Sequence, residues 1–268
     1  MSDKKQISLL ETRGKIDAID SEIHRLLMSR AELVQNVQNA KAAEGPIVNA
    51  MHADREIEMF RRFSANHTGC LPLASLQRIF REMIATFSHL QCPFKVFVLK
   101  GEPLHRDVAR YFYGTVIEIV ECSTLAEMLD RIKAPTSDIV LLAAEGKSLA
   151  AFHKIIGQGC QIFARLPFWD DGEAYGLDFP DMFVLGHAPL KTVANDYTVV
   201  ATKTDAMNAQ ELLKQAGFEA NIEFGYEGIN YCVIKAFANL ESQCWRDIEK
   251  IFVKNDIAVD FLGIYGKV

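Results

Sequence analysis

Arg30 and Lys41 have a spacing that could hold a small anion. Arg30 interrupts an apolar heptad, in the position between Leu26 and Leu33 where another apolar residue is expected. A guanidinium on such a seam is costly to bury unless an anion pairs with it. Lys41 follows eleven residues later. In a helix this spacing places it on nearly the same face as Arg30, about 16 Å further along the axis. The pair therefore predicts an anion site on one long helix.

Arg13 is a third cation of the same stretch. It precedes Arg30 by seventeen residues, or about 25 Å of helix, so the two cannot reach one small ligand from one helix. Arg13 could complete the site only from a second copy of the chain. The apolar heptad consists of Ile16, Ile19, Ile23, Leu26, Leu33, Val37 and Ala40. Such a seam predicts a partner helix, so both arguments favour a homodimer.

The elements that position these residues are predicted from periodicity and helix breakers. One helix should cover residues 6–43 and end before Gly45 and Pro46, and two more should cover 53–64 and 73–90. The predicted fold of the N-terminal domain, residues 1–92, is therefore all-α with three helices.

The rest of the chain changes character at Pro93. Predicted strands at 95–99, 116–121 and 138–143 alternate with helices at 105–113 and 125–132, which is typical of a parallel α/β layer. Residues 166–192 contain three prolines and three glycines, so we expect a long, partly irregular connection. The tail, 197–264, reads βαββαβ, the ferredoxin-like order. These patterns predict further domains at 93–192 and 193–268.

Composition limits the class of protein. The chain has 268 residues, is 49% hydrophobic and carries a net charge of -6, which argues against nucleic acid as a partner. We find no run of about 18 apolar residues that could span a membrane. Six cysteines lack CxxC pairing, which favours reduced thiols in a cytoplasmic protein and no metal site.

Polar residues at the three predicted helices resemble those of the all-helical chorismate mutases. The resemblance covers residues 7–91. The matching positions are residues 12–20, Leu26-Leu27, Arg30, Leu33-Val34, Val37, Ala40-Lys41, Asp54-Arg55-Glu56, residues 78–82 and Gln91. Membership would imply an intertwined homodimer in which the long first helix carries residues for both active sites, with chorismate as substrate.

Carried over by motif, the resemblance implies a role for each residue. Arg30, with Arg13 from the partner chain, would hold the two carboxylates of chorismate. Lys41 would contact the ether oxygen and a carboxylate, and Gln91 would donate to the same ether oxygen. Glu56 would accept from the ring hydroxyl.

Arg55 would support the carboxylate-binding network.

Two positions depart from the family pattern: Asn49 or His52 stands where an aspartate is expected, and Phe87 replaces a small hydroxyl residue.

These residue types suit the reaction that the resemblance implies. A Claisen rearrangement is an intramolecular step without proton transfer, so the enzyme must hold a dianion in its reactive conformer. It must also stabilise the negative charge that grows on the ether oxygen. Fixed cations and one amide do both, so we expect no cofactor and no metal.

Each residue taken alone also has a structural interpretation. Arg30 could set the register of a coiled coil. Lys41 could complement the dipole at the C-terminal end of the helix, and Glu56 could be a solvated carboxylate in a first turn. The ordered set favours a ligand site.

The C-terminal region resembles a degenerate prephenate dehydratase followed by an ACT-like domain. The residues that replace the dehydratase motifs are Gly101-Glu102-Pro103-Leu104, Leu142–Gly146 and Thr198-Val199-Val200. The last segment lacks the arginine of the family motif, so we expect dehydratase activity to be absent. Residues 235–238 replace the ACT effector motif, which weakens the expectation of an amino-acid effector.

Several functions stay open on the sequence alone. The leading one is a chorismate mutase in aromatic amino-acid biosynthesis. The alternatives are a bifunctional chorismate mutase/prephenate dehydratase and a non-catalytic regulatory protein that binds an aromatic amino acid. The C-terminal region could act as a stabilising remnant, a small-molecule sensor or a protein-docking module.

Overall fold

The structure, a computed structural model, describes residues 8–44, 49–157, 159–168, 178–192 and 196–268. The chain divides into two compact units, Met1–Ile47 and Val48–Val268. The helices are α1 (Leu9–Glu44), α2 (Ala53–Asn66), α3 (Leu73–Gln91), α4 (Pro103–Tyr113), α5 (Leu125–Asp130), α6 (Gly146–His153), α7 (Ala206–Gln215) and α8 (Gln243–Lys254). The strands are β1 (Val96–Leu99), β2 (Ile119–Cys122), β3 (Ile139–Ala143), β4 (Gln161–Leu166), β5 (Met182–Gly186), β6 (Asp196–Thr202), β7 (Ala220–Tyr226), β8 (Ile229–Ile234) and β9 (Val259–Gly266).

The first unit contains α1, an uninterrupted helix of 36 residues, as predicted. Its start is fixed by a reciprocal capping box, in which the Ser8 and Glu11 side chains each accept from the other residue's backbone N–H. The apolar heptad faces solvent in the single chain: Ile16, Ile19 and Ile23 expose 50%, 59% and 50% of their surface. An apolar stripe of this length normally packs against another helix.

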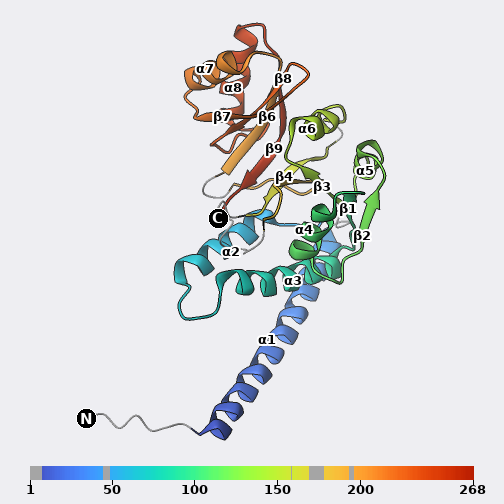
Figure 1. The fold of residues 1–268 in the computed structure, drawn as a ribbon, viewed down its shortest axis with the longest axis vertical. Helices are drawn as coiled ribbons and strands as arrows, with labels where there is room; N and C mark the ends of the chain where they lie inside the picture. The colour runs from blue at the N-terminus through green and yellow to red at the C-terminus, as the bar shows by residue number, and fades with distance from the viewer. Residues whose placement is uncertain (1–7, 45–48, 158, 169–177, 193–195) are drawn as a thin grey trace, which may run out of the picture. The chain divides into compact units, whose positions relative to one another are not determined.

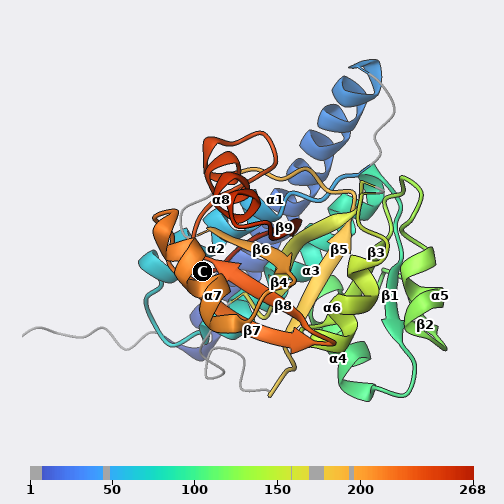
Figure 2. The same cartoon turned by 90° about the horizontal axis from the view of Figure 1, so that it is seen from above.

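The second unit is built on a nine-stranded mixed sheet in the order β2-β1-β3-β5-β4-β9-β6-β8-β7 (Figure 2). Strand β1 pairs in parallel with β2 and β3, as expected for a parallel α/β layer. Strand β5 pairs antiparallel with both β3 and β4. The expectation of an irregular connection over 166–192 was therefore wrong at Met182–Gly186. The reason is that these five residues form a fully buried apolar run. Periodicity alone cannot distinguish a strand from other buried structure in such a run.

Residues 196–266 form the predicted βαββαβ unit, with strand order β9-β6-β8-β7. Figure 1 shows α7 and α8 beside this part of the sheet. Their Leu212, Leu213 and Trp245 are buried with Val200 and Cys232 of the strands.

Strand β9 joins the tail to β4 through a parallel pair at Ile162 and Gly263. Gly263 has a φ of +146°, and a Cβ there would collide with the backbone of Ile162, so only glycine permits this contact.

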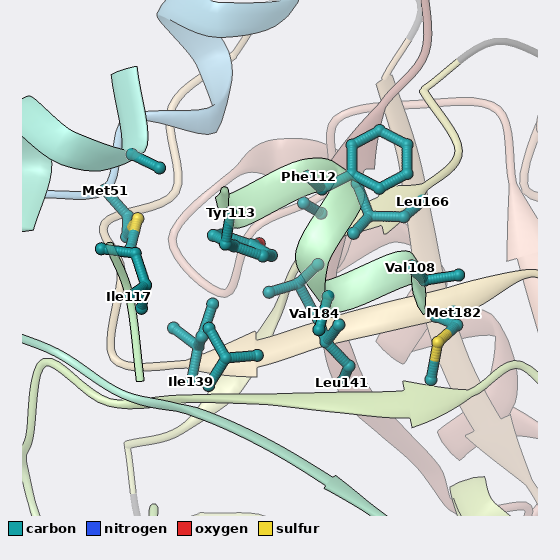
Figure 3. Packing of buried hydrophobic residues seen from close by; sticks show 14 of the residues in the cluster. Met51, Val108, Phe112, Tyr113, Ile117, Ile139, Leu141, Leu166, Met182 and Val184 are labelled. Atoms are coloured by element: carbon teal, nitrogen blue, oxygen red, sulfur yellow. The ribbon is translucent and has the colours of Figure 1, made fainter. Parts of the chain in front are cut away.

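Two further hydrophobic clusters fill the opposite faces of the α/β layer. On one face, Val108 and Phe112 of α4 pack with Ile139, Leu141 and Val184 of the strands (Figure 3). The same cluster contains Ile57 and Phe60 of α2. On the other face, α5 and α6 cover Phe97, Val140 and Leu142. Helices α2 and α3 therefore share a core with the sheet.

Cys232 gives this core a testable pH dependence. The thiol is buried on β8, and burial raises its pKa to about 12. The pKa of a cysteine in the unfolded chain is about 8.5. Below that pH the thiol is protonated in both states and its stabilising contribution is fully present. The contribution is lost as pH rises from the unfolded pKa toward the folded pKa, because only the unfolded state then releases its proton. We expect Cys232→Ala to lose less stability than the wild type between about pH 8 and pH 10. Urea unfolding at both pH values measures this, and parallel losses would contradict it.

Candidate active site

The predicted cations of the first unit lie on α1, where the sequence places them. Arg13 is exposed, and Arg30 is partly buried within the apolar heptad. Lys41 also belongs to α1, but its side chain lies outside the described residues. The arginines therefore occupy one continuous helix, and its length keeps them apart, as the spacing requires.

Arg55 and Glu56 lie in the first turn of α2. The carboxylates of Asp54 and Glu56 are stabilised there by the positive end of the helix dipole. Asn49 precedes the helix and accepts a hydrogen bond from Met51 N at 2.6 Å, and His52 is the N-cap residue. Arg55 is exposed on this helix.

Glu56 is not a solvated carboxylate. Its Oε2 forms an ion pair with Arg81 Nη1 of α3, and the two side chains expose only 11% and 3% of their surface. Arg81 Nε also donates to the Phe112 carbonyl at 2.8 Å. A buried carboxylate held by a buried guanidinium keeps one position, because leaving either charge unpaired would be costly.

Aromatic rings complete the surroundings of Arg81. The guanidinium carbon lies 5.2 Å from the ring centre of Tyr113 and 5.3 Å from that of Phe168. Such cation–π contacts stabilise a cation that is removed from water. Sequence reasoning identified Arg81 only as part of a matching motif and missed its pairing. The available signal was an arginine four positions before Ala85 and three before Ile84, on the buried face of the third helix.

Gln91 is the last residue of α3 and is partly buried. Its Nε2 donates to the Phe87 carbonyl at 3.2 Å, one helical turn earlier. Phe87, which departs from the family pattern, is itself buried together with Ser88. The aromatic ring is thus part of the packing of this helix.

The six predicted residues divide between the two units. Arg13, Arg30 and Lys41 belong to Met1–Ile47, whereas Arg55, Glu56 and Gln91 belong to Val48–Val268. Their convergence on one substrate stays a prediction.

The segments that replace two dehydratase motifs meet around a small hollow of about 150 Å³. It lies at the carboxyl ends of β1 and β3, the position where open α/β sheets usually bind ligands. Its polar lining is Glu102, His105, Glu145 and Ser148. Burial lowers the pKa of His105, against the opposing effect of both carboxylates. Among the described residues the lining therefore offers two carboxylates and no lysine or arginine.

The described residues contain no group of three or more His, Cys, Asp or Glu side chains that could hold a metal ion. No helix in these parts is long and apolar enough to cross a bilayer.

The fold and the candidate site residues define a class of protein, in which a helical segment with cationic and amide side chains precedes a mixed α/β sheet. Comparison with known families makes the assignment specific. Residues 12–92 match the family model of chorismate mutase type II. The resemblance found in the sequence is confirmed for this part of the chain.

Two curated relatives are similar over a longer stretch. A bifunctional chorismate mutase/prephenate dehydratase from Aquifex aeolicus is 29% identical over 141 residues, which cover 51% of this chain and 39% of the relative. The protein of the same name from Neisseria gonorrhoeae is 24% identical over 141 residues, covering 52% and 38%. Each alignment is longer than the segment 12–92, but the chain spans only about two fifths of the length of these relatives.

One of the solved structures to which this chain is similar is the prephenate dehydratase from Streptococcus mutans. It matches with a TM-score of 0.45 and 12% identity, over 64% of this chain and 96% of that one.

Proposed function

We propose that the protein catalyses the Claisen rearrangement of chorismate to prephenate. The observation that carries this proposal is the chorismate mutase type II match over residues 12–92, which includes all six predicted site residues. The three helices of this segment are α1, α2 and α3.

In the proposed mechanism the cations bind the substrate and stabilise charge. Arg30 and the partner subunit's Arg13 hold the two carboxylates, which fixes the compact conformer in which the bond-forming atoms are close. Lys41 and Gln91 donate to the ether oxygen as negative charge grows on it. Arg55 supports the carboxylate-binding network. No proton moves, so none of these groups has to change its protonation state.

Glu56 is proposed to accept a hydrogen bond from the ring hydroxyl of chorismate. The ion pair with Arg81 supports this role, because it holds the carboxylate in one position before substrate arrives. A supporting residue that fixes a polar group reduces the ordering needed on binding.

We also propose a homodimer with shared active sites. The support is the exposed heptad of α1, where apolar side chains would pack against the α1 of a second copy. The same arrangement would supply Arg13 to the site of the partner subunit. Chorismate would be the small-molecule substrate, and the product would enter aromatic amino-acid biosynthesis.

A direct assay tests the proposal. Purified protein should convert chorismate to prephenate, at a rate that a metal chelator does not change. Chromatographic measurement of both compounds over time gives the rate. Folded protein, verified by circular dichroism, that shows no conversion above the uncatalysed rate would contradict the proposal.

The names of the two relatives favour a second candidate, a bifunctional enzyme that also acts on prephenate. The hollow beside Glu102 and Glu145 argues against it, because carboxylates repel an anionic substrate and the described lining contains no lysine or arginine to bind the carboxylates of prephenate. We therefore expect phenylpyruvate to form from prephenate only at the spontaneous rate in the same assay. The C-terminal region would then have a structural or regulatory role, with an amino-acid effector as one form of regulation.

A further inference from the structure

Arg81 is held by residues that lie outside the segment matching chorismate mutase type II. That segment ends at residue 92. It contains Glu56, the ion-pair partner of Arg81, but the carbonyl that accepts from Arg81 Nε at 2.8 Å belongs to Phe112. The rings that lie 5.2 and 5.3 Å from the guanidinium carbon belong to Tyr113 and Phe168. We call Phe112, Tyr113 and Phe168 the arginine seat, and all three belong to the α/β layer.

The arginine seat is buried and closely packed. None of its three side chains is exposed to solvent beyond a few per cent of its surface. Phe112 and Tyr113 end α4 within the cluster that covers this face of the sheet (Figure 3). The ring of Phe168 packs edge-on against that of Phe112, with centres 5.8 Å apart and an angle of 87°. Close packing resists movement of such side chains, so the seat offers Arg81 one position.

Phe168 also contacts the helix that carries Glu56. Its ring centre lies 6.1 Å from that of Phe60 in α2. Phe60 follows Glu56 by four residues, so the two side chains lie on the same face of the helix. Arg61, the next residue of α2, donates to the backbone carbonyl of Lys267 after β9. One ring of the α/β layer therefore supports both the helix of Glu56 and the cation that pairs with Glu56.

Glu82 fixes the register of α3 against α4. Its Oε1 accepts from the backbone N–H and from the hydroxyl of Thr115, both at 3.0 Å. Arg81, the preceding residue of α3, binds the Phe112 carbonyl. Gly114 lies between these two contacts, and a Cβ there would collide with the Glu82 carboxylate. Two consecutive residues of α3 thus bind the end of α4, and a shift between the helices would break both contacts.

We propose that Tyr113 and Phe168 are positioning residues for the mutase reaction. They hold Arg81, and Arg81 holds the Glu56 carboxylate where it accepts from the ring hydroxyl of chorismate. This inference rests on the proposed function and deepens it, because it makes the α/β layer part of the mutase site. A displacement of about 1 Å in such a group can lower the rate by about 10²-fold.

Steady-state kinetics on the full chain tests the proposal. Tyr113→Leu and Phe168→Leu remove a ring but keep an apolar side chain, so each should lower kcat/KM for chorismate by about tenfold. Tyr113→Phe keeps the ring and should retain kcat/KM within about threefold of the wild type. Circular dichroism checks that the variants stay folded. Wild-type kinetics in both leucine variants would overturn the proposal.

The same substitution in a Glu56→Gln background shows whether the ring acts through Glu56. If it does, Phe168→Leu should cause little further loss of kcat/KM there, because the group that it positions is already changed. Phe152→Leu is the matched control, because Phe152 is fully buried in the cluster on the other face of the sheet. It should lose stability but keep the wild-type kcat/KM. A full loss in the Glu56→Gln background, or a loss in Phe152→Leu as large as that in Phe168→Leu, would indicate general damage and overturn the proposal.

Urea unfolding gives a readout that does not depend on turnover. Phe168→Leu should lower the free energy of unfolding more in the wild type than in Glu56→Gln/Arg81→Gln, because the second protein has no guanidinium for the ring to contact. Equal losses would overturn the proposal. A wild type without mutase activity would overturn the proposed function itself, whereas unchanged kinetics in the leucine variants of an active protein would overturn this inference alone.

Discussion

Replacing Arg30 with alanine should lower kcat/KM for chorismate by about 10²–10³-fold, the effect of removing a preorganised group that stabilises charge in a transition state. Alanine leaves one carboxylate of the substrate without its cation, so both binding and alignment suffer. Steady-state kinetics measures the loss, and size-exclusion chromatography should show the same oligomer as the wild type. Activity close to that of the wild type would show that Arg30 only sets the register of the helix.

Arg25→Ala is the matched control on the same helix. Arg25 is exposed and pairs with Glu22 at 2.6 Å, three residues away. Exposed pairs contribute little to stability, so the variant should keep the wild-type rate. An equal loss in Arg25→Ala and Arg30→Ala would point to damage to α1 rather than to the site.

Mixing two inactive variants tests the shared site. One variant carries Arg13→Ala and the other carries Arg30→Ala. If Arg13 acts from the partner subunit, a heterodimer of these two variants contains one site with both arginines and one site with neither. Refolding the two variants together should therefore restore part of the activity that each lacks alone. No recovery, with heterodimers present, would contradict an active site built from two chains.

Removing Arg81 should have the largest effect on stability. Arg81→Gln leaves the Glu56 carboxylate buried without its cation, and breaking such a pair costs about 3–5 kcal/mol. The variant also loses the hydrogen bond to the Phe112 carbonyl. Urea unfolding followed by circular dichroism measures the change. Arg106→Gln, which removes an exposed pair with Glu121, should change stability by no more than about 1 kcal/mol.

A double variant separates the ion pair from packing. Glu56→Gln/Arg81→Gln contains no uncompensated charge, so it should be more stable than Arg81→Gln alone. If the double variant is instead destabilised by the sum of the two single changes, the two charges are not coupled. Its mutase rate reports on Glu56 separately, because Glu56→Gln alone removes the proposed acceptor while keeping Arg81.

The sequence predicts most elements of this fold, because their signals are local. The helices at 9–44, 53–66 and 73–91 follow from apolar periodicity and from breakers such as Pro46 and Pro93. The βαββαβ tail follows from alternating short patterns. Strand β5 could not be predicted in this way, because a five-residue apolar run between prolines has no period that separates a strand from a buried loop.

The candidate site was predictable in its residues but not in their surroundings. The order and spacing of the polar residues resemble those of the all-helical chorismate mutases, and this resemblance identifies Arg30, Glu56 and Gln91 as candidate site residues. The partner of Glu56 depends on how α3 packs against α2 and α4, which is a long-range property of the fold.

The position of β9 in the sheet has a consequence for biosynthesis. This strand follows every other element in the chain, yet it lies between β4 and β6. On the ribosome, β4 emerges well before β9, so one edge of β4 lacks its native neighbour while the intervening residues are translated. An unpaired strand edge invites association with other chains. The nascent protein is therefore exposed to aggregation until β9 emerges, and molecular chaperones that cover strand edges would raise its yield.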